Sequence, residues 1–135
     1  MARGIAVVFA YAGHDVTIVD AKARDVADCA RVAKEAIDEV RGTLATLASF
    51  GLFAPADVEG LIARVSVVTE AQAAGALADA AVIFEGVPEV PDLKREVLAR
   101  ISALVGPAPI IASTTSTILV DDLSNAVLFK NRIQS

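Results

Sequence analysis

The sequence predicts an α/β fold in which helices cover a buried parallel sheet, and three observations support this. The length of 135 residues is that of one ordinary domain. Apolar residues make up 55% of the chain, mostly Ala, Val, Leu and Ile, with no Trp and a single Tyr. This composition suits buried parallel strands, which are apolar throughout. Finally, segments with helical spacing alternate with short β-branched runs, which is typical of a doubly wound parallel sheet with right-handed crossovers.

The first half of the chain gives a helix, a strand and a long helix. Residues 2–12 are predicted to be helical, because Gly13 follows as a natural C-terminal stop. Residues 16–19 form a short β-branched strand. Residues 24–49 form a long helix that Gly51 ends. Its apolar residues recur every three or four positions and are expected to face inward: Val26, Ala30, Ala33, Ile37, Val40, Leu44 and Leu47.

The second half repeats the alternation with shorter elements. Strands are predicted at residues 64–69, 81–84 and 110–113, and helices at residues 56–63, 70–77, 91–105 and 120–125. Pro91 occupies a favoured early position of its helix, whose inward residues are expected to be Leu93, Val97, Leu98 and Ile101.

Polar residues follow the predicted strands where each one ends. They are Asp20, Glu85 to Glu89, and Ser113 to Ser116. In open parallel sheets, ligands bind beyond the carboxyl ends of the strands. The sequence therefore predicts one binding edge.

Asp20 has a specific candidate role at this edge. An acid at the end of the second strand of a dinucleotide fold accepts hydrogen bonds from the adenosine ribose, and it repels the 2′-phosphate of NADP. The alternatives are an ordinary loop aspartate or an N-cap of the next helix. A glycine fingerprint should lie about twenty residues upstream, but counting back reaches Met1 and no Gly-x-Gly is present.

Three ordered motifs resemble the 3-hydroxyacyl-CoA dehydrogenase family over roughly residues 1–127. Residues 1–20, MARGIAVVFAYAGHDVTIVD, are similar to the family sequence that follows its first strand and glycine loop. Phe84–Glu89, followed by Lys94, resembles the family's Glu-Ala-x-x-Glu segment with its later lysine. Residues 112–116, ASTTS, resemble the family's Ala-Ser-Asn-Thr-Ser motif. The resemblance implies a Rossmann-type doubly wound parallel sheet that lacks the first strand and the glycine loop.

The resemblance also implies roles for single residues. Met1 would lie in the phosphate-binding loop, and Asp20 would hold the ribose of NAD. Val87 and Glu89 would line the nicotinamide side. Lys94 would reach the cofactor or the CoA substrate, and Ser116 would act as the catalytic residue by hydrogen-bonding the 3-oxygen of the substrate beside the nicotinamide.

Each of these roles has a simpler alternative. Glu89 could be a solvated acid before a helix, and Lys94 a surface residue. Ser116 could be only a turn hydroxyl, and Glu85 could cap a backbone group.

The implied activity is the NAD-dependent oxidation of a 3-hydroxyacyl-CoA to the 3-oxo compound in fatty-acid metabolism, by an enzyme whose full-length relatives are homodimers. The reaction needs a base, and the chain has no histidine in a His-x-x-Asn-Pro type motif. We therefore expect a partial domain over residues 1–127, a divergent tail over 128–135, and no turnover by this chain alone. The alternative is a non-enzymatic module that binds a nucleotide or a protein partner.

Composition excludes several other functions. A net charge of −5 disfavours nucleic-acid binding, and no apolar run is long enough to span a membrane. The single Cys29 rules out an internal disulfide and indicates a cytoplasmic location. Residues 1–13 mimic a signal peptide but are short for one. His14 is expected to stabilise a turn, and no metal site is expected.

Overall fold

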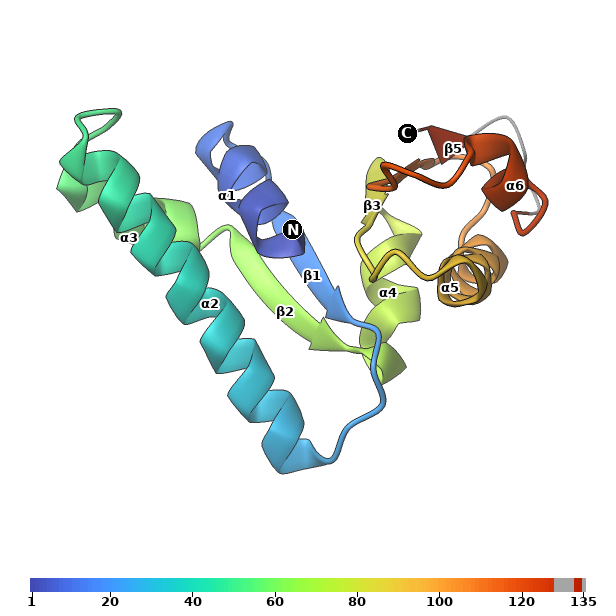
Figure 1. Ribbon diagram of the computed structural model, residues 1–135. Coiled ribbons are helices and arrows are strands. Elements are labelled where there is room, and N and C mark those ends of the chain that lie inside the picture. The colour runs from blue at the N-terminus through green and yellow to red at the C-terminus, as the bar shows by residue number, and fades with distance from the viewer. Residues whose placement is uncertain (128–132, 135) are drawn as a thin grey trace. The chain divides into compact units, whose positions relative to one another are not determined.

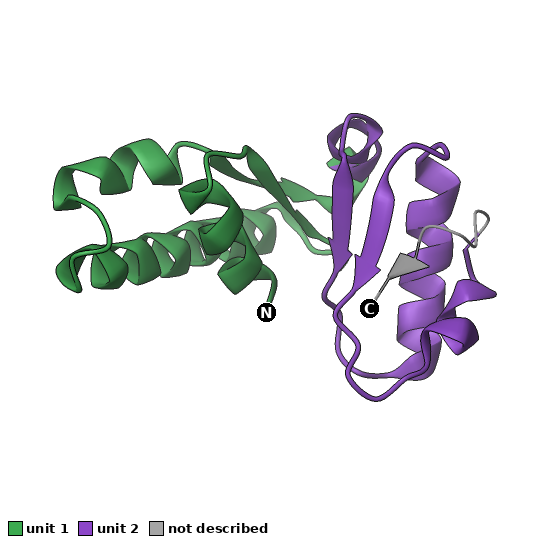
Figure 2. Ribbon diagram, turned by 90° about the horizontal axis from the view of Figure 1, so that it is seen from above, with its two compact units in different colours: residues 1–72 green, residues 73–135 purple. Residues whose placement is uncertain are grey.

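The computed structural model describes residues 1–127 and 133–134 (Figure 1). The chain divides into two compact units, Met1–Gln72 and Ala73–Ser135, coloured separately in Figure 2. We describe each unit by itself. Both combine parallel strands with covering helices, as the sequence predicts.

The first unit pairs two parallel strands, β1 (Val16–Asp20) and β2 (Val65–Thr69), along their whole length. Its helices are α1 (Ala2–Tyr11), α2 (Val26–Ser49) and α3 (Val58–Ile62), and a 3-10 turn at Pro55–Asp57 leads into α3. A second 3-10 turn, Glu70–Gln72, follows β2. The core consists of small and branched side chains from these helices and β2: Ala6, Val7, Ala10, Val40, Leu44, Ala48, Val58, Ile62 and Val65.

Glycines end both long helices of this unit, as the sequence predicts. Gly13 has φ 91°, and the N–H of His14 reaches back to the carbonyl of Phe9. Gly51 has φ 82°, and the N–H of Leu52 bonds to the carbonyl of Leu47. Helices commonly end at a residue with a left-handed backbone conformation, after which a backbone N–H donates a hydrogen bond to a carbonyl of the last turn. Glycine adopts that conformation without steric cost.

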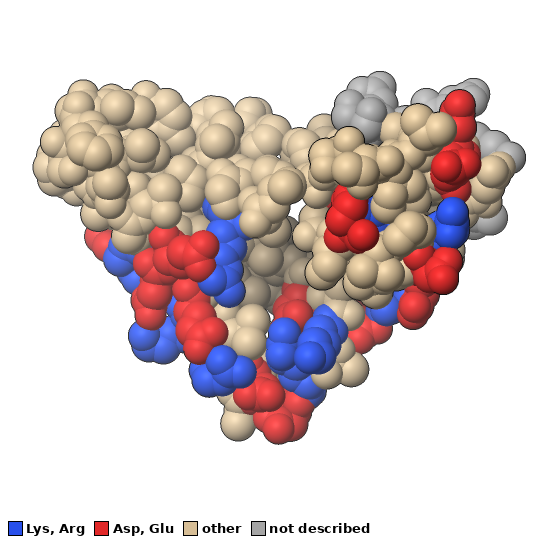
Figure 3. All heavy atoms as spheres, viewed as in Figure 1, with Lys and Arg blue, Asp and Glu red and all other residues tan. Residues whose placement is uncertain are grey.

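The inward face of α2 is narrower than its apolar spacing suggests. Its buried residues lie four apart and belong to the second half of the helix: Ala36, Val40, Leu44 and Ala48. The expectations for Val26 and Ala30 are wrong, because both residues are exposed, Val26 to 88% at the first turn. Ion pairs cover the outer face instead, including Arg31 with Asp28 and Glu35, and Lys34 with Asp38. In Figure 3, viewed as in Figure 1, acidic and basic side chains are mixed on the surface over α2.

The second unit contains α4 (Ala73–Ala78), β3 (Val82–Glu85), α5 (Pro91–Leu104), β4 (Ile110–Ser113) and α6 (Val120–Ser124). β3 and β4 pair in parallel, with Glu85 opposite Ser113. Ile133–Gln134 form β5 and pair in parallel with β4. The rest of the predicted tail, residues 128–132 and 135, lies outside the described residues.

The face of α5 that points inward differs by one position from the expected one. Leu93 is 36% exposed, whereas Lys94 is completely buried together with Val97 and Leu98. Pro91 begins the helix, so the buried stripe starts at the fourth helical residue and recurs at three- and four-residue spacings. A charged side chain thus occupies the first position of the apolar face.

In the described part of the chain, every strand pairing is parallel. The strands form a two-stranded sheet, β1-β2, and a three-stranded sheet, β3-β4-β5. Among the described residues, the first element is α1, and β1 follows it. No described helix has the length and apolar character needed to span a membrane.

Candidate functional site

The carboxyl ends of β3 and β4 carry a buried acid and a buried hydroxyl. Glu85 and Ser113 are the last residues of their strands and lie opposite each other. Both lie on the face that also buries Ile83 and Ile111, because strand residues two apart share a face. The Ser113 hydroxyl donates to Glu85 Oε2 at 2.6 Å.

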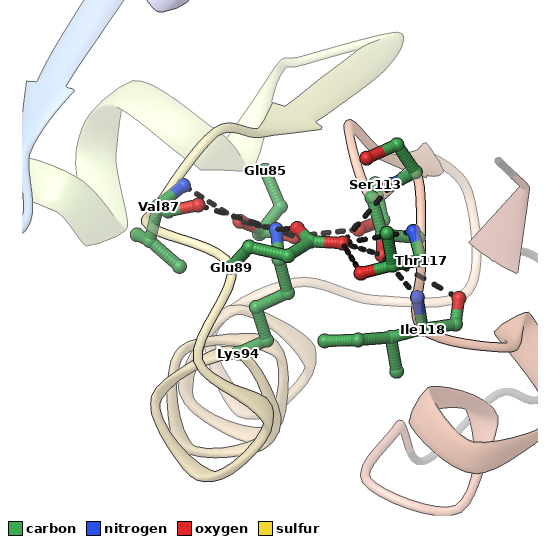
Figure 4. Close-up of polar contacts among 9 residues, drawn as sticks. Glu85, Val87, Glu89, Lys94, Ser113, Thr117 and Ile118 are labelled. Carbon is green, nitrogen blue, oxygen red and sulfur yellow. Dashed lines mark hydrogen bonds and ion pairs between the residues drawn. The ribbon is translucent and has the colours of Figure 1, made fainter.

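Lys94 completes this buried cluster from α5 (Figure 4). Its Nζ donates to the two carboxylate oxygens of Glu85 at 3.1 and 3.0 Å and to the carbonyl of Val87 at 3.2 Å. The N–H of Val87 in turn donates to Glu85 Oε1 at 2.7 Å. Both charged side chains are fully buried, so the alternative of a surface lysine is wrong. The expectation that Glu85 caps a backbone group is confirmed.

Glu89 joins the loop after β3 to the loop after β4. Its Oε1 accepts hydrogen bonds from the Thr115 hydroxyl at 2.5 Å, the Ser116 N–H at 3.0 Å, and the N–H and hydroxyl of Thr117 at 3.1 and 3.0 Å. Its Oε2 lies 3.4 Å from Lys94 Nζ. The hydrogen bonds to Oε1, that of the Thr115 hydroxyl first, lower the pKa of Glu89 to about 2 against the opposing effect of partial desolvation. Glu89 is therefore not the free, solvated acid of the simpler alternative.

Ser116 lies on the loop that Glu89 holds. The residue is exposed, and its backbone N–H is used by Glu89. Within the described part of the chain, no hydrogen bond engages its hydroxyl. The loop is braced on either side, because the Thr114 N–H donates to the carbonyl of Glu85 and the Ile118 N–H to the Thr115 hydroxyl. The structure thus brings together four predicted site residues: Val87, Glu89, Lys94 and Ser116.

The other two predicted site residues belong to the first unit. Met1 is 79% exposed and is the N-cap of α1, where its carbonyl accepts the N–H groups of Gly4 and Ile5. The N–H groups of Ala2 and Arg3 precede the first intrahelical hydrogen bonds of α1. They point out of the helix N-terminus, where backbone donors and the helix dipole favour a phosphate.

Asp20 is the last residue of β1 and is largely buried. Its Oδ2 accepts from Arg24 Nε at 2.6 Å, and its Oδ1 accepts from the N–H of Lys22 at 3.3 Å. The N-cap alternative is wrong, because Asp25 caps α2 by accepting the N–H of Asp28 at 2.8 Å.

A hollow of about 530 Å³ opens beside the carboxyl ends of β1 and β2. Its lining residues come from the loop after β1, the first turn of α2 and the turn after β2: Lys22, Ala23, Arg24, Val26, Cys29, Thr69, Glu70 and Ala71. This volume lies in the range of ligand sites. An adenine dinucleotide needs an acceptor for its ribose, donors for its pyrophosphate and space for its adenine. The Asp20 carboxylate, the N-terminus of α1 and this hollow can supply them, so the residues present fit NAD.

The only histidine lies at the other end of β1. His14 is exposed in the turn between α1 and β1, with its ring 5.9 Å from that of Phe9. Asp20 and the hollow lie at the carboxyl end of the same strand.

Sequence reasoning placed Glu85, Ser113 and Thr115 at the binding edge but gave none of them a role in holding the site together. It did not include Thr117 in that edge. One signal could have found the buried cluster. Glu85 continues the buried face of its strand, and Lys94 begins the buried stripe of α5. A buried acid and a buried lysine require each other.

The parallel α/β fold with polar groups at the carboxyl ends of its strands defines a dinucleotide-binding domain of the Rossmann type. Comparison with known families then identifies the family to which the chain belongs. The model of the 3-hydroxyacyl-CoA dehydrogenase NAD-binding domain matches residues 1–134, so the chain belongs to this family, and its cofactor is NAD.

Individual relatives agree with this assignment. The chain is 32% identical over 125 residues to the L-carnitine dehydrogenase/betainyl-CoA thioesterase of Agrobacterium fabrum, covering 93% of this chain and 23% of that protein. The (S)-3-hydroxybutyryl-CoA dehydrogenase of Ralstonia eutropha matches with a TM-score of 0.83 and 27% identity, over 98% of this chain and 44% of the relative. The 3-hydroxybutyryl-CoA dehydrogenase of Escherichia coli K12 shares the fold, with a TM-score of 0.81, 24% identity, and coverage of 97% and 26%. The chain thus spans less than half the length of each of these relatives.

Proposed function

We propose that this chain supplies the cofactor-binding part of an NAD-dependent dehydrogenase that oxidises the 3-hydroxyl group of a 3-hydroxyacyl-CoA to a 3-oxo group. One observation carries the proposal. Glu89 joins the loop that follows β3 to the loop that follows β4. Ser116 is exposed to solvent on the second of these loops. These loops lie at the sheet edge where α/β folds bind their ligands.

In this proposal the cofactor residues fall into two groups. Asp20 holds the adenosine ribose, and Met1 begins the helix whose N-terminus receives the pyrophosphate. Val87 and Glu89 lie on the nicotinamide side. Lys94 holds both, because its Nζ donates to the carbonyl of Val87 and forms an ion pair with Glu89. When bound, NAD supplies the hydride acceptor.

Ser116 is the proposed contact to the reacting oxygen. A hydroxyl can donate to the 3-oxygen of the substrate in both its hydroxyl and its oxo form. Because Glu89 binds the backbone of residues 116 and 117, the Ser116 hydroxyl is held on an ordered loop. Holding a polar group in place before the reaction is the usual contribution of a protein to such chemistry.

We infer that this chain does not supply the histidine base of the proposed reaction. Oxidation of a hydroxyl needs a group that takes its proton as the hydride leaves, and the only histidine, His14, is at the amino end of β1. We therefore predict no turnover when the purified chain is mixed with NADH and acetoacetyl-CoA and absorbance at the NADH band is followed. Steady turnover that Ser116→Ala abolishes would contradict this prediction.

Binding can be measured without turnover. Calorimetric titration of acetoacetyl-CoA into the chain with NADH should show that Ser116→Ala weakens binding by about two- to ten-fold, as expected for one neutral hydrogen bond. Ser124→Ala is the matched control, because the Ser124 hydroxyl donates to the carbonyl of Asp121 in α6. Equal losses in both variants would contradict the role of Ser116.

A second substrate is favoured by the 32% identity to an L-carnitine dehydrogenase. Carnitine also carries a hydroxyl on its third carbon, but it has a quaternary ammonium group and no CoA. Titrating L-carnitine beside acetoacetyl-CoA separates the two substrate classes, and tighter binding of carnitine would replace the CoA proposal. From the family we further propose that the complete enzyme is a cytoplasmic homodimer of fatty-acid metabolism.

A further inference from the structure

The loop after β1 holds an ion pair between Asp20, which has a role in the proposed NAD site, and Arg24, which has none so far. Arg24 Nε donates to Asp20 Oδ2 at 2.6 Å, and the two side chains are only 21% and 17% exposed. Asp20 also accepts the N–H of Lys22, and Asp25 caps α2 directly after Arg24. The loop is therefore short and fixed at both ends, so the guanidinium has a defined position beside the carboxylate.

The remaining donors of Arg24 are available to a ligand. Only Nε is used in the ion pair, and among the described residues nothing accepts a hydrogen bond from the two Nη atoms. Arg24 and Lys22 both line the hollow beside β1 and β2. A planar guanidinium with two free nitrogens is the side chain best suited to bind a phosphate through two hydrogen bonds.

We propose that Arg24 is the specificity-determining partner of Asp20: it holds the carboxylate that selects NAD, and it would bind the 2′-phosphate of NADP once that carboxylate is removed. This inference rests on the proposed role of Asp20 at the adenosine ribose. In the unchanged chain, Asp20 neutralises Arg24. Glu70 lies in the lining of the hollow and adds a negative charge near Arg24. Both negative charges oppose the binding of a 2′-phosphate. Substituting Asp20 removes the charge that lies next to Arg24.

Four forms of the 135-residue chain test the proposal: the unchanged protein, Asp20→Ser, Arg24→Gln and the double variant. Each is titrated by calorimetry with NAD and NADP, and with 5′-AMP and adenosine 2′,5′-bisphosphate, which probe the adenosine half alone. Arg31→Gln is the matched control, since Arg31 also pairs with acids on α2 but is 54% exposed and does not line the hollow. Asp20→Asn provides a second removal of the charge if the serine variant does not keep its circular dichroism spectrum.

We expect Asp20→Ser to bind NADP and the 2′,5′-bisphosphate about ten- to a hundred-fold more tightly than the unchanged chain does, because a hydrogen-bonded charge pair is gained. Arg24→Gln should weaken NAD binding several-fold, and the double variant should lose the NADP gain. If the unchanged chain binds NAD but Asp20→Ser gains no NADP binding, or keeps the gain without Arg24, the proposed role of Arg24 is wrong. If the unchanged chain binds neither NAD nor 5′-AMP, the proposed function fails as well.

Discussion

At the scale of single residues, Glu85 and Lys94 form a fully buried ion pair in the second unit. Removing two charges from water is costly, and the mutual attraction offsets this cost only when further hydrogen bonds satisfy both groups. Here Ser113, the N–H of Val87 and the carbonyl of Val87 supply those bonds. Among the described residues, no buried side-chain nitrogen or oxygen lacks a partner.

Substituting one member of this pair should be strongly destabilising. We predict that Lys94→Met lowers the free energy of unfolding by about 3–5 kcal/mol, because the Glu85 carboxylate remains buried without its cation. Urea denaturation followed by circular dichroism measures the effect. Combining it with Glu85→Leu should recover a large part of the loss.

The control for this prediction is Lys34→Met. Lys34 is 76% exposed in an ion pair on α2, and such pairs contribute about 0–1 kcal/mol. A loss of less than about 1 kcal/mol for Lys94→Met, within the range of that surface pair, would show that the buried pair does not stabilise the fold.

Individual site residues were predictable to different degrees. Asp20, Glu89 and Ser116 follow strands in the sequence, so their place at a carboxyl edge could be predicted. The partners of Glu89 could not, because Thr115 and Thr117 meet it only through the register of β3 with β4. Nor could Arg24, which lies in a loop with no periodicity to place its side chain.

At the scale of elements, Glu89 fastens the loop of residues 114–118 to the loop after β3. Its pKa falls to about 2 in the folded chain, from an ordinary 4.5. A lowered pKa means that the stabilisation is fully present above pH 4.5 and is lost as the pH falls toward 2, where the folded carboxylate takes up its proton. The loops should therefore be firmly joined at neutral pH.

Amide hydrogen exchange tests whether Glu89 holds the loop of residues 114–118 in place. We predict that Glu89→Gln increases exchange of the Ser116 and Thr117 amides at pH 7, because the charged acceptor of both N–H groups is lost. In the unchanged chain, the same protection should decline between about pH 4.5 and 2. Glu96→Gln, an exposed change on α5, serves as control. Equal exchange in the two variants would contradict the role of Glu89.

The positions of the helices and strands were predictable because their signals are local. Gly13, Gly51 and Pro91 lie at the helix boundaries where the sequence placed them. The faces that point inward were less predictable, as Val26 and Leu93 show. Apolar spacing identifies a helix, but the neighbouring elements decide which part of its apolar stripe is covered.

At the scale of the whole molecule, each sheet keeps an open edge. Among the described strands, β1 pairs only with β2, and β3 pairs only with β4. Each sheet therefore has an outer strand with one unpaired edge among the described residues. Unpaired edges expose backbone donors and acceptors that can pair with another chain.

We therefore predict that the 135-residue chain self-associates and unfolds with weak cooperativity. Light scattering after gel filtration measures the first property and thermal denaturation the second. An added N-terminal apolar strand ending in Gly-x-Gly-x-Met should raise the melting temperature, whereas a Gly/Ser extension of equal length should not. A monodisperse monomer that melts sharply above about 55 °C, within the mesophile range, would show that the sheets tolerate their open edges.

The most direct test of the account is a calorimetric titration of the unchanged chain with NAD and NADP at equal ionic strength. NAD binding follows from the family, and the preference follows from Asp20 at the end of β1. We predict that NAD binds about ten-fold or more tightly than NADP, as expected when a charged hydrogen bond to the ribose is replaced by repulsion of a phosphate. Equal or tighter binding of NADP would contradict the account.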